Sequence, residues 1–140
     1  MTNVEYFIYG LVDSRDDKIF YVGMTNNMKN RLIGHLSKAN GKPKKWITSH
    51  DKNSQYIADM LLEGGLPSII LIDSVITANR KLVRAMEKCY IAYHIANGDI
   101  LTNTIIDNPL FDKNYYLQRV EYLKGLATLQ EKTFTVNFPI

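Results

Sequence analysis

Side chains that can act on a phosphodiester are concentrated near the start of the chain. The triplets Phe7-Ile8-Tyr9 and Tyr21-Val22-Gly23 are separated by eleven residues, and Arg31 and His35 follow at a helical spacing. An arginine can hold a phosphate and stabilise the charge that develops on its oxygens, while phenols and imidazoles can exchange protons. Together these groups predict chemistry at a phosphate ester.

A carboxylate suited to holding a metal ion occurs much later in the sequence, at Glu87. It lies beside Val83 and Tyr90 at the border of an apolar helical stripe, so its side chain can point into a pocket at a sheet. A buried carboxylate is costly without a cation, and Mg²⁺ commonly takes one or two protein carboxylates together with water and substrate oxygens. We therefore expect one Mg²⁺ or Mn²⁺ ion at Glu87. The alternative is a solvated helix glutamate paired with a nearby Lys or Arg.

The other candidate residues also have purely structural alternatives. Tyr9 and Tyr21 can be aromatic residues packed in a sheet. Arg31 can form a surface ion pair, and His35 can be a polar surface group. Asn103 can be a loop amide that satisfies backbone groups.

The elements that must position these residues can be predicted from apolar patterns and breaker residues. In chain order they are strands at 5–12 and 19–23, helices at 25–40 and 54–63, a strand at 68–76, and helices at 79–97 and 113–131. Gly23 is assigned as a structural turn residue. The apolar run 68–76 is typical of a strand buried on both faces or at a sheet centre, and it should pair with the hairpin. Residues 101–106 are predicted to be extended, and the alternating apolar residues of 133–140 to form a strand.

The order of these elements lacks the regular alternation of strand and helix that a doubly wound parallel sheet needs. It predicts an α+β fold with a small, three-stranded, mainly antiparallel sheet flanked by helices, and a C-terminal helical extension. Residues 1–108 are expected to form a catalytic domain, with the helix and tail of 109–140 packed on it. The tail could instead pair with another copy of the chain, which makes a homodimer a candidate assembly.

Composition narrows the class of protein. A chain of 140 residues with 46% apolar content can bury one ordinary core. Its apolar stretches are too short to span a membrane, and no basic-then-apolar leader opens the chain. The lone Cys89 falls at an apolar helical position, which favours a core residue in a reducing compartment. We expect a cytoplasmic protein encoded by a bacterium or phage.

A lysine-rich segment follows the first predicted helix. The formal net charge is only +3, but no acidic residue occurs between Ser37 and His50. The segment predicts phosphate contacts and a ring that can stack on a base, although a solvated loop is the alternative. The candidate DNA contacts are Lys29, Lys38, Lys42, Lys44, Lys45 and Trp46.

These motifs resemble those of the GIY-YIG nuclease family. Phe7-Ile8-Tyr9 stands in place of the first triplet, with Phe7 where the family usually has glycine, and Tyr21-Val22-Gly23 stands in place of the second. The resemblance covers roughly residues 5–106. Its later elements are Gly23-Met24-Thr25, Asn27, Arg31, His35, Glu87 and Asn103.

The resemblance implies a metal-dependent DNA endonuclease. A water would attack the phosphate in line with the leaving oxygen, with Tyr9 or Tyr21 as general base, Tyr9 being favoured. A metal ion at Glu87 would stabilise the leaving group, and Asn103 would orient the site or touch phosphate. Two other hypotheses remain open: a catalytically inactive nucleic-acid-binding module of the same fold, and a structural protein that uses its tyrosine-rich C-terminal half as a partner surface.

Overall fold

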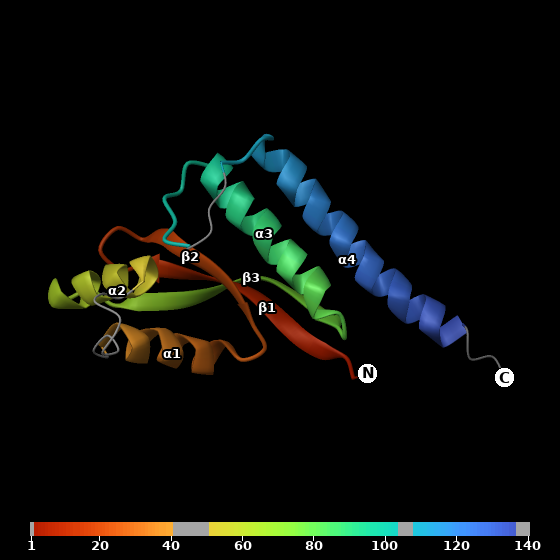
Figure 1. The fold of residues 1–140 in the computed structure, drawn as a ribbon, viewed down its shortest axis with the longest axis horizontal. Helices are drawn as coiled ribbons and strands as arrows, with labels where there is room; N and C mark the ends of the chain where they lie inside the picture. Colours follow the sequence, from red (N-terminus) through yellow and green to blue (C-terminus); the bar gives the residue numbers. More distant parts are fainter. Residues whose placement is uncertain (1, 41–50, 104–107, 137–140) are drawn as a thin grey trace.

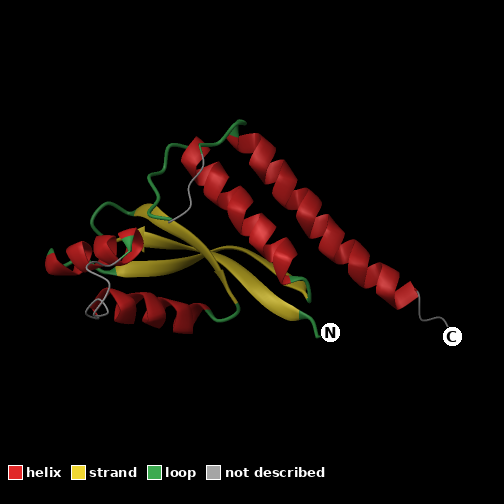
Figure 2. Cartoon of the chain, in the orientation of Figure 1, coloured by secondary structure: helices red, strands yellow, loops and turns green. Residues whose placement is uncertain are grey.

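The computed structural model describes residues 2–40, 51–103 and 108–136, with side chains described as far as residue 128. A sheet lies between two layers of helices, with α1 on one side and α3 and α4 on the other (Figure 1). Figure 2 shows the three strands between these layers. The elements are β1 (Val4–Asp13), β2 (Lys18–Thr25), α1 (Met28–Asn40), α2 (Lys52–Leu62), β3 (Pro67–Thr77), α3 (Arg80–Ala96) and α4 (Lys113–Val136).

The sheet is antiparallel throughout and has the order β2-β1-β3. This confirms the α+β class, the hairpin and the pairing of β3 with it. The expectation that β3 is central or buried on both faces is wrong, because β1 is the central strand and β3 lies at an edge. Leu71 and Ile76 of β3 are more than half exposed, at 56% and 54%. A continuous apolar run gives no information about which strand of the sheet is central.

Each face of the sheet has its own hydrophobic core, because successive strand residues point to opposite faces. On one face, Ile8 and Val22 pack in a buried cluster that includes residues of α3 and α4. On the other face, Tyr9 and Leu11 pack in a cluster that includes residues of α1 and α2. Cys89 packs half-buried against the first cluster. Tyr9 therefore faces α1, whereas α3 covers the opposite face.

Local capping explains where the first two helices begin. The Asn27 side chain accepts a hydrogen bond from the backbone N–H of Asn30 at the start of α1. Asp51 caps α2 in the same way by accepting from Ser54 N–H. Short polar side chains at this position satisfy amides that lack a partner within the helix. The helix predicted over 25–40 is confirmed, and it begins at Met28.

Asp73 of β3 joins the C-terminal helix to the rest of the fold. Its carboxylate accepts hydrogen bonds from Tyr90 Oη at 2.7 Å and Lys124 Nζ at 2.9 Å. Ser74 N–H donates a third at 2.8 Å. Although burial opposes ionisation, these donors hold the pKa of Asp73 below its ordinary value. One carboxylate thus connects β3, α3 and α4.

Two sequence expectations near the C-terminus differ from the structure. The strand predicted at 133–140 is wrong over 133–136, because α4 continues to Val136; residues 137–140 lie outside the described residues. Adding residues to an existing helix forms one hydrogen bond per residue, whereas a new strand needs a partner. The segment 101–103 runs beside β2 without being assigned as a strand, and 104–107 are not described. Within the described ranges, no helix has the length and apolar character needed to cross a membrane.

Candidate active site

Tyr9 lies across Gly23, its partner in the neighbouring strand. The Tyr9 side chain is fully buried, and a Cβ added at Gly23 would be 2.5 Å from the phenol oxygen. Gly23 is inside β2 and not in a turn, so the assignment as a turn residue is corrected. Its role is to leave room for the ring, which no other residue type would do without displacing Tyr9.

The phenol oxygen of Tyr9 contacts two residues of α1. Arg31 Nε donates to it at 3.1 Å, and His35 Nε2 lies 2.8 Å away. The ring of Tyr21 lies close to both aromatic neighbours, with its centroid 6.1 Å from that of Tyr9 and 5.0 Å from that of His35. The two tyrosines, the arginine and the histidine predicted from sequence are therefore brought together.

His35 is buried and not at the surface, with 6% of its area exposed. Its second ring nitrogen, Nδ1, lies 3.2 Å from the amide nitrogen of Asn53. Thr102 Oγ1 donates to Asn53 Oδ1 at 2.6 Å, so the amide is held from its other end. Both ring nitrogens are thus bonded within the protein. His35 therefore lies behind Tyr9 and contacts its phenol oxygen through Nε2.

Sequence reasoning missed Asn53 and Thr102. Asn53 belongs to the first turn of α2, where a polar residue is ordinary, and nothing local indicates that it is buried. The Thr102 backbone N–H donates to the carbonyl of Phe20 at 2.7 Å, which fixes the 101–103 segment to β2. Only long-range packing brings the two residues to His35.

Burial dominates the protonation of both groups. It raises the pKa of the Tyr9 phenol, and nearby Tyr21 adds to the effect, while Arg31 only partly opposes it. Burial lowers the pKa of His35 to about 4, with the positive charges of Arg31 and Lys38 acting in the same direction. Tyr9 is therefore a neutral phenol and His35 a neutral imidazole near pH 7.

Glu87 reaches the site from the opposite face of the sheet. Because β2 is an edge strand, side chains from α1 and α3 can meet past its edge. Burial raises the pKa of Glu87; the charges of Arg84 and Arg31 and a hydrogen bond from the backbone of Met24 act against this. Glu87 in turn contributes to the raised pKa of Tyr9. The carboxylate is thus electrostatically coupled to the Tyr9–Arg31 pair.

A cleft of about 700 Å³ opens at this edge, and Tyr21, Glu87 and Asn103 all line it. Tyr21 is half-buried, whereas Tyr9 lies fully buried behind it. Of Tyr9 and Tyr21, it is Tyr21 that lines the cleft.

The side chain of Asn103 is bonded to the backbone of β2. Its Oδ1 accepts from Val22 N–H at 3.2 Å, and its Nδ2 donates to the Val22 carbonyl at 2.7 Å. The amide thereby completes the hydrogen bonding of the strand edge next to Tyr21. These two bonds support an orienting role for Asn103, and the second N–H of its Nδ2 group can still donate to a ligand in the cleft that Asn103 lines.

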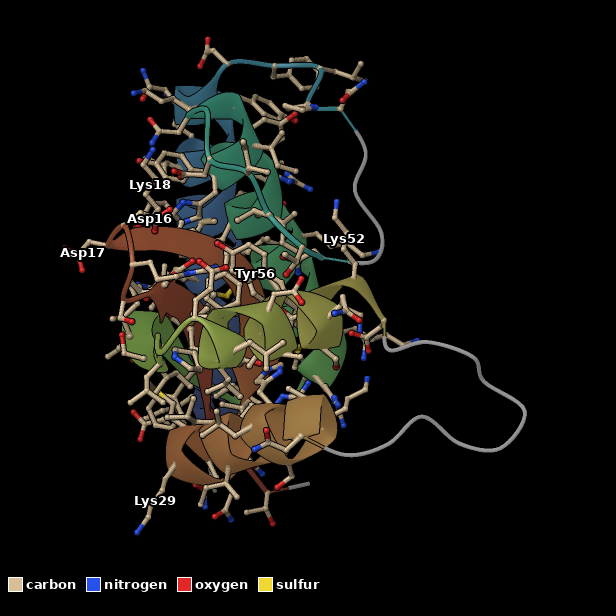
Figure 3. The ribbon with its side chains drawn as sticks, turned by 90° about the vertical axis from the view of Figure 1, so that its left-hand side faces the viewer. Asp16, Asp17, Lys18, Lys29, Lys52 and Tyr56 are labelled. Carbon is tan, nitrogen blue, oxygen red and sulfur yellow. The ribbon has the colours of Figure 1, made fainter. Side chains whose placement is uncertain are left out.

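The predicted DNA-contacting lysines are only partly described. Lys29 is exposed at the outer side of α1 and points away from the rest of the molecule (Figure 3). Lys38 is exposed but forms a salt bridge with Asp51. The remaining four predicted contacts, Lys42, Lys44, Lys45 and Trp46, lie outside the described residues.

The donors at the site fit a divalent ion that is held mainly by its substrate. Across the described residues, no three His, Cys, Asp or Glu side chains are grouped so that they could enclose a metal. Glu87 supplies one carboxylate, with its pKa raised by burial, and it forms no salt bridge in the part of the chain that is described. A single half-buried carboxylate beside an open cleft suits Mg²⁺, which keeps several waters and binds substrate phosphate oxygens.

A comparison with family models gives a match to the GIY-YIG catalytic domain over residues 5–94, more than half of the chain. The chain belongs to the GIY-YIG family. Membership implies nuclease activity in general, and both tyrosine triplets, Arg31, His35 and Glu87 lie within the matched residues. No curated protein and no solved structure gives a significant match.

The GIY-YIG match ends before several residues that complete this site. It stops within α3, so Asn103 and the whole of α4 lie beyond it. The resemblance read from the sequence extended to residue 106. The segment after residue 94 therefore has to be interpreted from its own contacts.

Proposed function

We propose that the protein is a metal-dependent DNA endonuclease that hydrolyses phosphodiester bonds. The observation that supports this most strongly is the convergence at the β2 edge. Glu87 of α3 and Tyr21 of β2 line one cleft, and Glu87 is electrostatically coupled to the Arg31–Tyr9 pair from the opposite face of the sheet. A cation site, a phosphate-binding guanidinium and a phenol are the groups that this reaction requires.

Each side chain takes a role that follows from its position. Arg31 holds the scissile phosphate and stabilises the charge that builds up on its oxygens. Tyr21, at the cleft, accepts the proton of the attacking water. A divalent ion held by Glu87 would supply positive charge for the leaving oxygen.

The buried phenol of Tyr9 is proposed to position Arg31, in place of the role as general base that the sequence favoured. Full burial keeps Tyr9 away from water, and its raised pKa keeps the phenol protonated, so it is not available to accept a proton. Its oxygen meets Arg31 Nε, and His35 fixes it from behind. Asn103 holds the strand on which Tyr21 lies.

Nicking of supercoiled plasmid in Mg²⁺ or Mn²⁺ tests the function. Wild-type protein should nick the DNA, and Glu87→Gln and Tyr21→Phe should each lower the rate by roughly 10²-fold or more, the effect typical of losing an acid–base group. Tyr9→Phe should lose less, because it keeps the ring and removes only a positioning contact. Tyr122→Phe, at an exposed tyrosine of α4, is the matched control and should be unchanged.

The inactive binding module gives a different result in the same assay. If wild-type protein binds DNA but leaves supercoiled, linear, branched and single-stranded forms intact in both metals, the enzyme proposal fails. If Tyr9→Phe loses more activity than Tyr21→Phe, the assignment of the base returns to Tyr9. Parallel reactions on RNA decide whether DNA is the preferred substrate.

A further inference from the structure

The cleft that contains Glu87 continues well beyond the catalytic groups. It follows α3 and ends against the segment that leads into α4, where Phe111, Tyr115 and Tyr116 line it. All three residues lie beyond the part of the chain that matches the family. The volume of about 700 Å³ falls within the range of roughly 300–1,000 Å³ that is usual for ligand sites.

The aromatic end of the cleft is ordered and exposed. Phe111 is 53% exposed and Tyr115 is 43% exposed, with ring centroids 4.2 Å apart and planes tilted by 31°. Tyr116 packs edge-on against Tyr115, and its hydroxyl accepts hydrogen bonds from the backbone N–H groups of Leu110 and Phe111. Tyr116 therefore holds the exposed pair in place. Such rings form a stacking surface for a flat ligand.

The side chains between the two ends of the cleft are cationic. Arg84, Lys88 and Arg119 line it, while Glu87 is the one carboxylate among the described lining residues. None of the three cations forms a salt bridge in the described ranges of the chain. These cations are suited to binding phosphates. They lie in the same cleft as the catalytic groups at one end and the aromatic rings at the other.

We propose that this cleft is a subsite for a nucleic-acid strand that carries at least one unpaired base beside the scissile phosphate. The base stacks on Phe111 and Tyr115, and the backbone phosphates lie along Arg84, Lys88 and Arg119. Stacking needs a free base face, which a continuous duplex hides between neighbouring base pairs. The inference rests on the proposed function for the identity of the ligand, and it adds a preference for flapped, branched or single-stranded DNA.

Binding measured without divalent metal separates this subsite from catalysis. The probes are a fluorescent duplex with a single-stranded flap and the same duplex fully paired, with chelator present so that neither is cut. Wild-type protein should bind the flapped probe more tightly. The double variant Phe111→Ala/Tyr115→Ala should weaken flapped binding by about 5- to 150-fold, as expected for loss of base stacking, and leave paired binding nearly unchanged.

Matched variants test the aromatic and cationic parts separately. Leu62→Ala, at an exposed apolar residue of α2 that does not line the cleft, should retain the preference. Arg119→Gln should weaken both probes and lower the dependence of binding on salt. Lys18→Gln, at the exposed start of β2 next to the hairpin turn, should change neither (Figure 3). Phe111→Leu/Tyr115→Leu keeps apolar bulk and tests the rings even if the alanine variant folds poorly.

The outcomes distinguish this proposal from the function itself. If the folded leucine variant retains the wild-type preference for the flapped probe, or if wild-type protein has none, the subsite is rejected even when plasmid nicking is normal. If the preference exists and is lost in the leucine variant while wild-type protein cuts nothing, the subsite stands and the nuclease proposal fails.

Discussion

At the scale of single residues, the Tyr9 oxygen is held by a chain of polar contacts that ends in the backbone. Asn53 donates through its amide nitrogen to His35 Nδ1, which leaves the imidazole proton on Nε2, facing Tyr9. The phenol oxygen then accepts two N–H groups, one from His35 and one from Arg31. Its own proton is free to point elsewhere. The arrangement fixes Arg31 without using a charged partner.

This chain predicts a pH dependence of stability. Burial lowers the pKa of His35 to about 4 from an ordinary 6.5, so between these values the unfolded chain binds a proton that the folded chain does not. Stability therefore falls as pH falls through that window, by about 3 kcal/mol at most at about 1.4 kcal/mol per pKa unit. In urea denaturation from pH 7.5 to 4, wild type should lose up to this much more stability than His35→Gln.

Glu87 contributes to the pH dependence with the opposite sign, because burial raises its pKa above the ordinary value. Both proteins retain Glu87, so its contribution cancels when the free energy of unfolding of His35→Gln is subtracted from that of wild type. If the free energies of unfolding of wild type and His35→Gln change in parallel with pH, His35 is not buried as a neutral base.

Gly23 provides a second prediction at this scale. Alanine would place a Cβ 2.5 Å from the Tyr9 phenol oxygen and 2.6 Å from the ring carbon that bears it. The ring has to move, and the Arg31 contact moves with it. We expect Gly23→Ala to lower plasmid nicking by at least about 10-fold, since small misplacements at a reacting centre are costly. Gly34→Ala, where nothing lies within 4 Å of an added Cβ, should be fully active.

At the scale of elements, the site depends on how helices are fixed to the sheet. Asp73 fixes α3 and α4 to β3 through Tyr90 and Lys124. At the other end of the sheet, the buried carboxylate of Asp13 accepts hydrogen bonds from Arg15 and from Tyr56 of α2. The donor groups of Arg15 and Tyr56 lower the pKa of Asp13 to about 2. Each anchor is a carboxylate with several donors, which suits a buried charge.

The Asp73 anchor predicts a measurable loss of stability. Asp73→Asn keeps the size of the side chain but removes the charge that Lys124 and Tyr90 stabilise. Charged hydrogen bonds of this kind are worth about 1.5–3 kcal/mol, so we expect a decrease of that order in the free energy of unfolding at pH 7. The pKa of Asp73 is lowered, so this contribution should be lost in wild type as pH falls below about 4.

Asp59→Asn is the control for this prediction, because Asp59 is an exposed residue of α2. It should change stability by no more than about 0.5 kcal/mol. Equal stabilities of Asp73→Asn and wild type across the pH range would mean that α4 is held by apolar packing alone.

At the scale of the whole molecule, the sequence predicts local features and misses those that depend on contacts between distant segments. Strand and helix positions follow from apolar period and capping residues, and the hairpin places Tyr9 beside β2 by pairing alone. The central position of β1 and the edge position of β3 depend on pairing between distant segments. The burial of His35 and its contact with Asn53 also need three separate elements to meet. Those features carry no local signal.

The site divides in the same way. Tyr21, Arg31 and Glu87 of the proposed site were predicted from residue type and spacing, together with resemblance to a family. Which phenol lines the cleft was not found, because both tyrosines occupy apolar strands and differ only in what packs over them. The cleft beyond Glu87 is likewise invisible in sequence, since it is formed where α3 meets the start of α4.

The boundary expected at residue 108 gives the last prediction. Val120, Leu123 and Ala127 of α4 are buried in the same cluster as Ile8 and Met86, so α4 contributes to the core that α3 shares. Burying one large apolar side chain is worth about 1.5–3 kcal/mol, and domain stabilities are only about 5–15 kcal/mol. A chain of residues 1–108 should therefore lose most of its stability and show no cooperative thermal unfolding by circular dichroism.

Single substitutions in α4 measure its contribution to the free energy of unfolding without truncating the chain. Leu123→Ala should cost about 2–5 kcal/mol, as for other buried leucines, while Tyr122→Ala at the adjacent exposed position should cost far less. Helix α4 also carries Arg119, which lines the cleft. Leu123→Ala leaves Arg119 in place, so this variant should lose DNA binding only to the extent that it unfolds. If residues 1–108 melt at the wild-type temperature and still nick DNA, then α4 is an appendage and the catalytic unit ends before it.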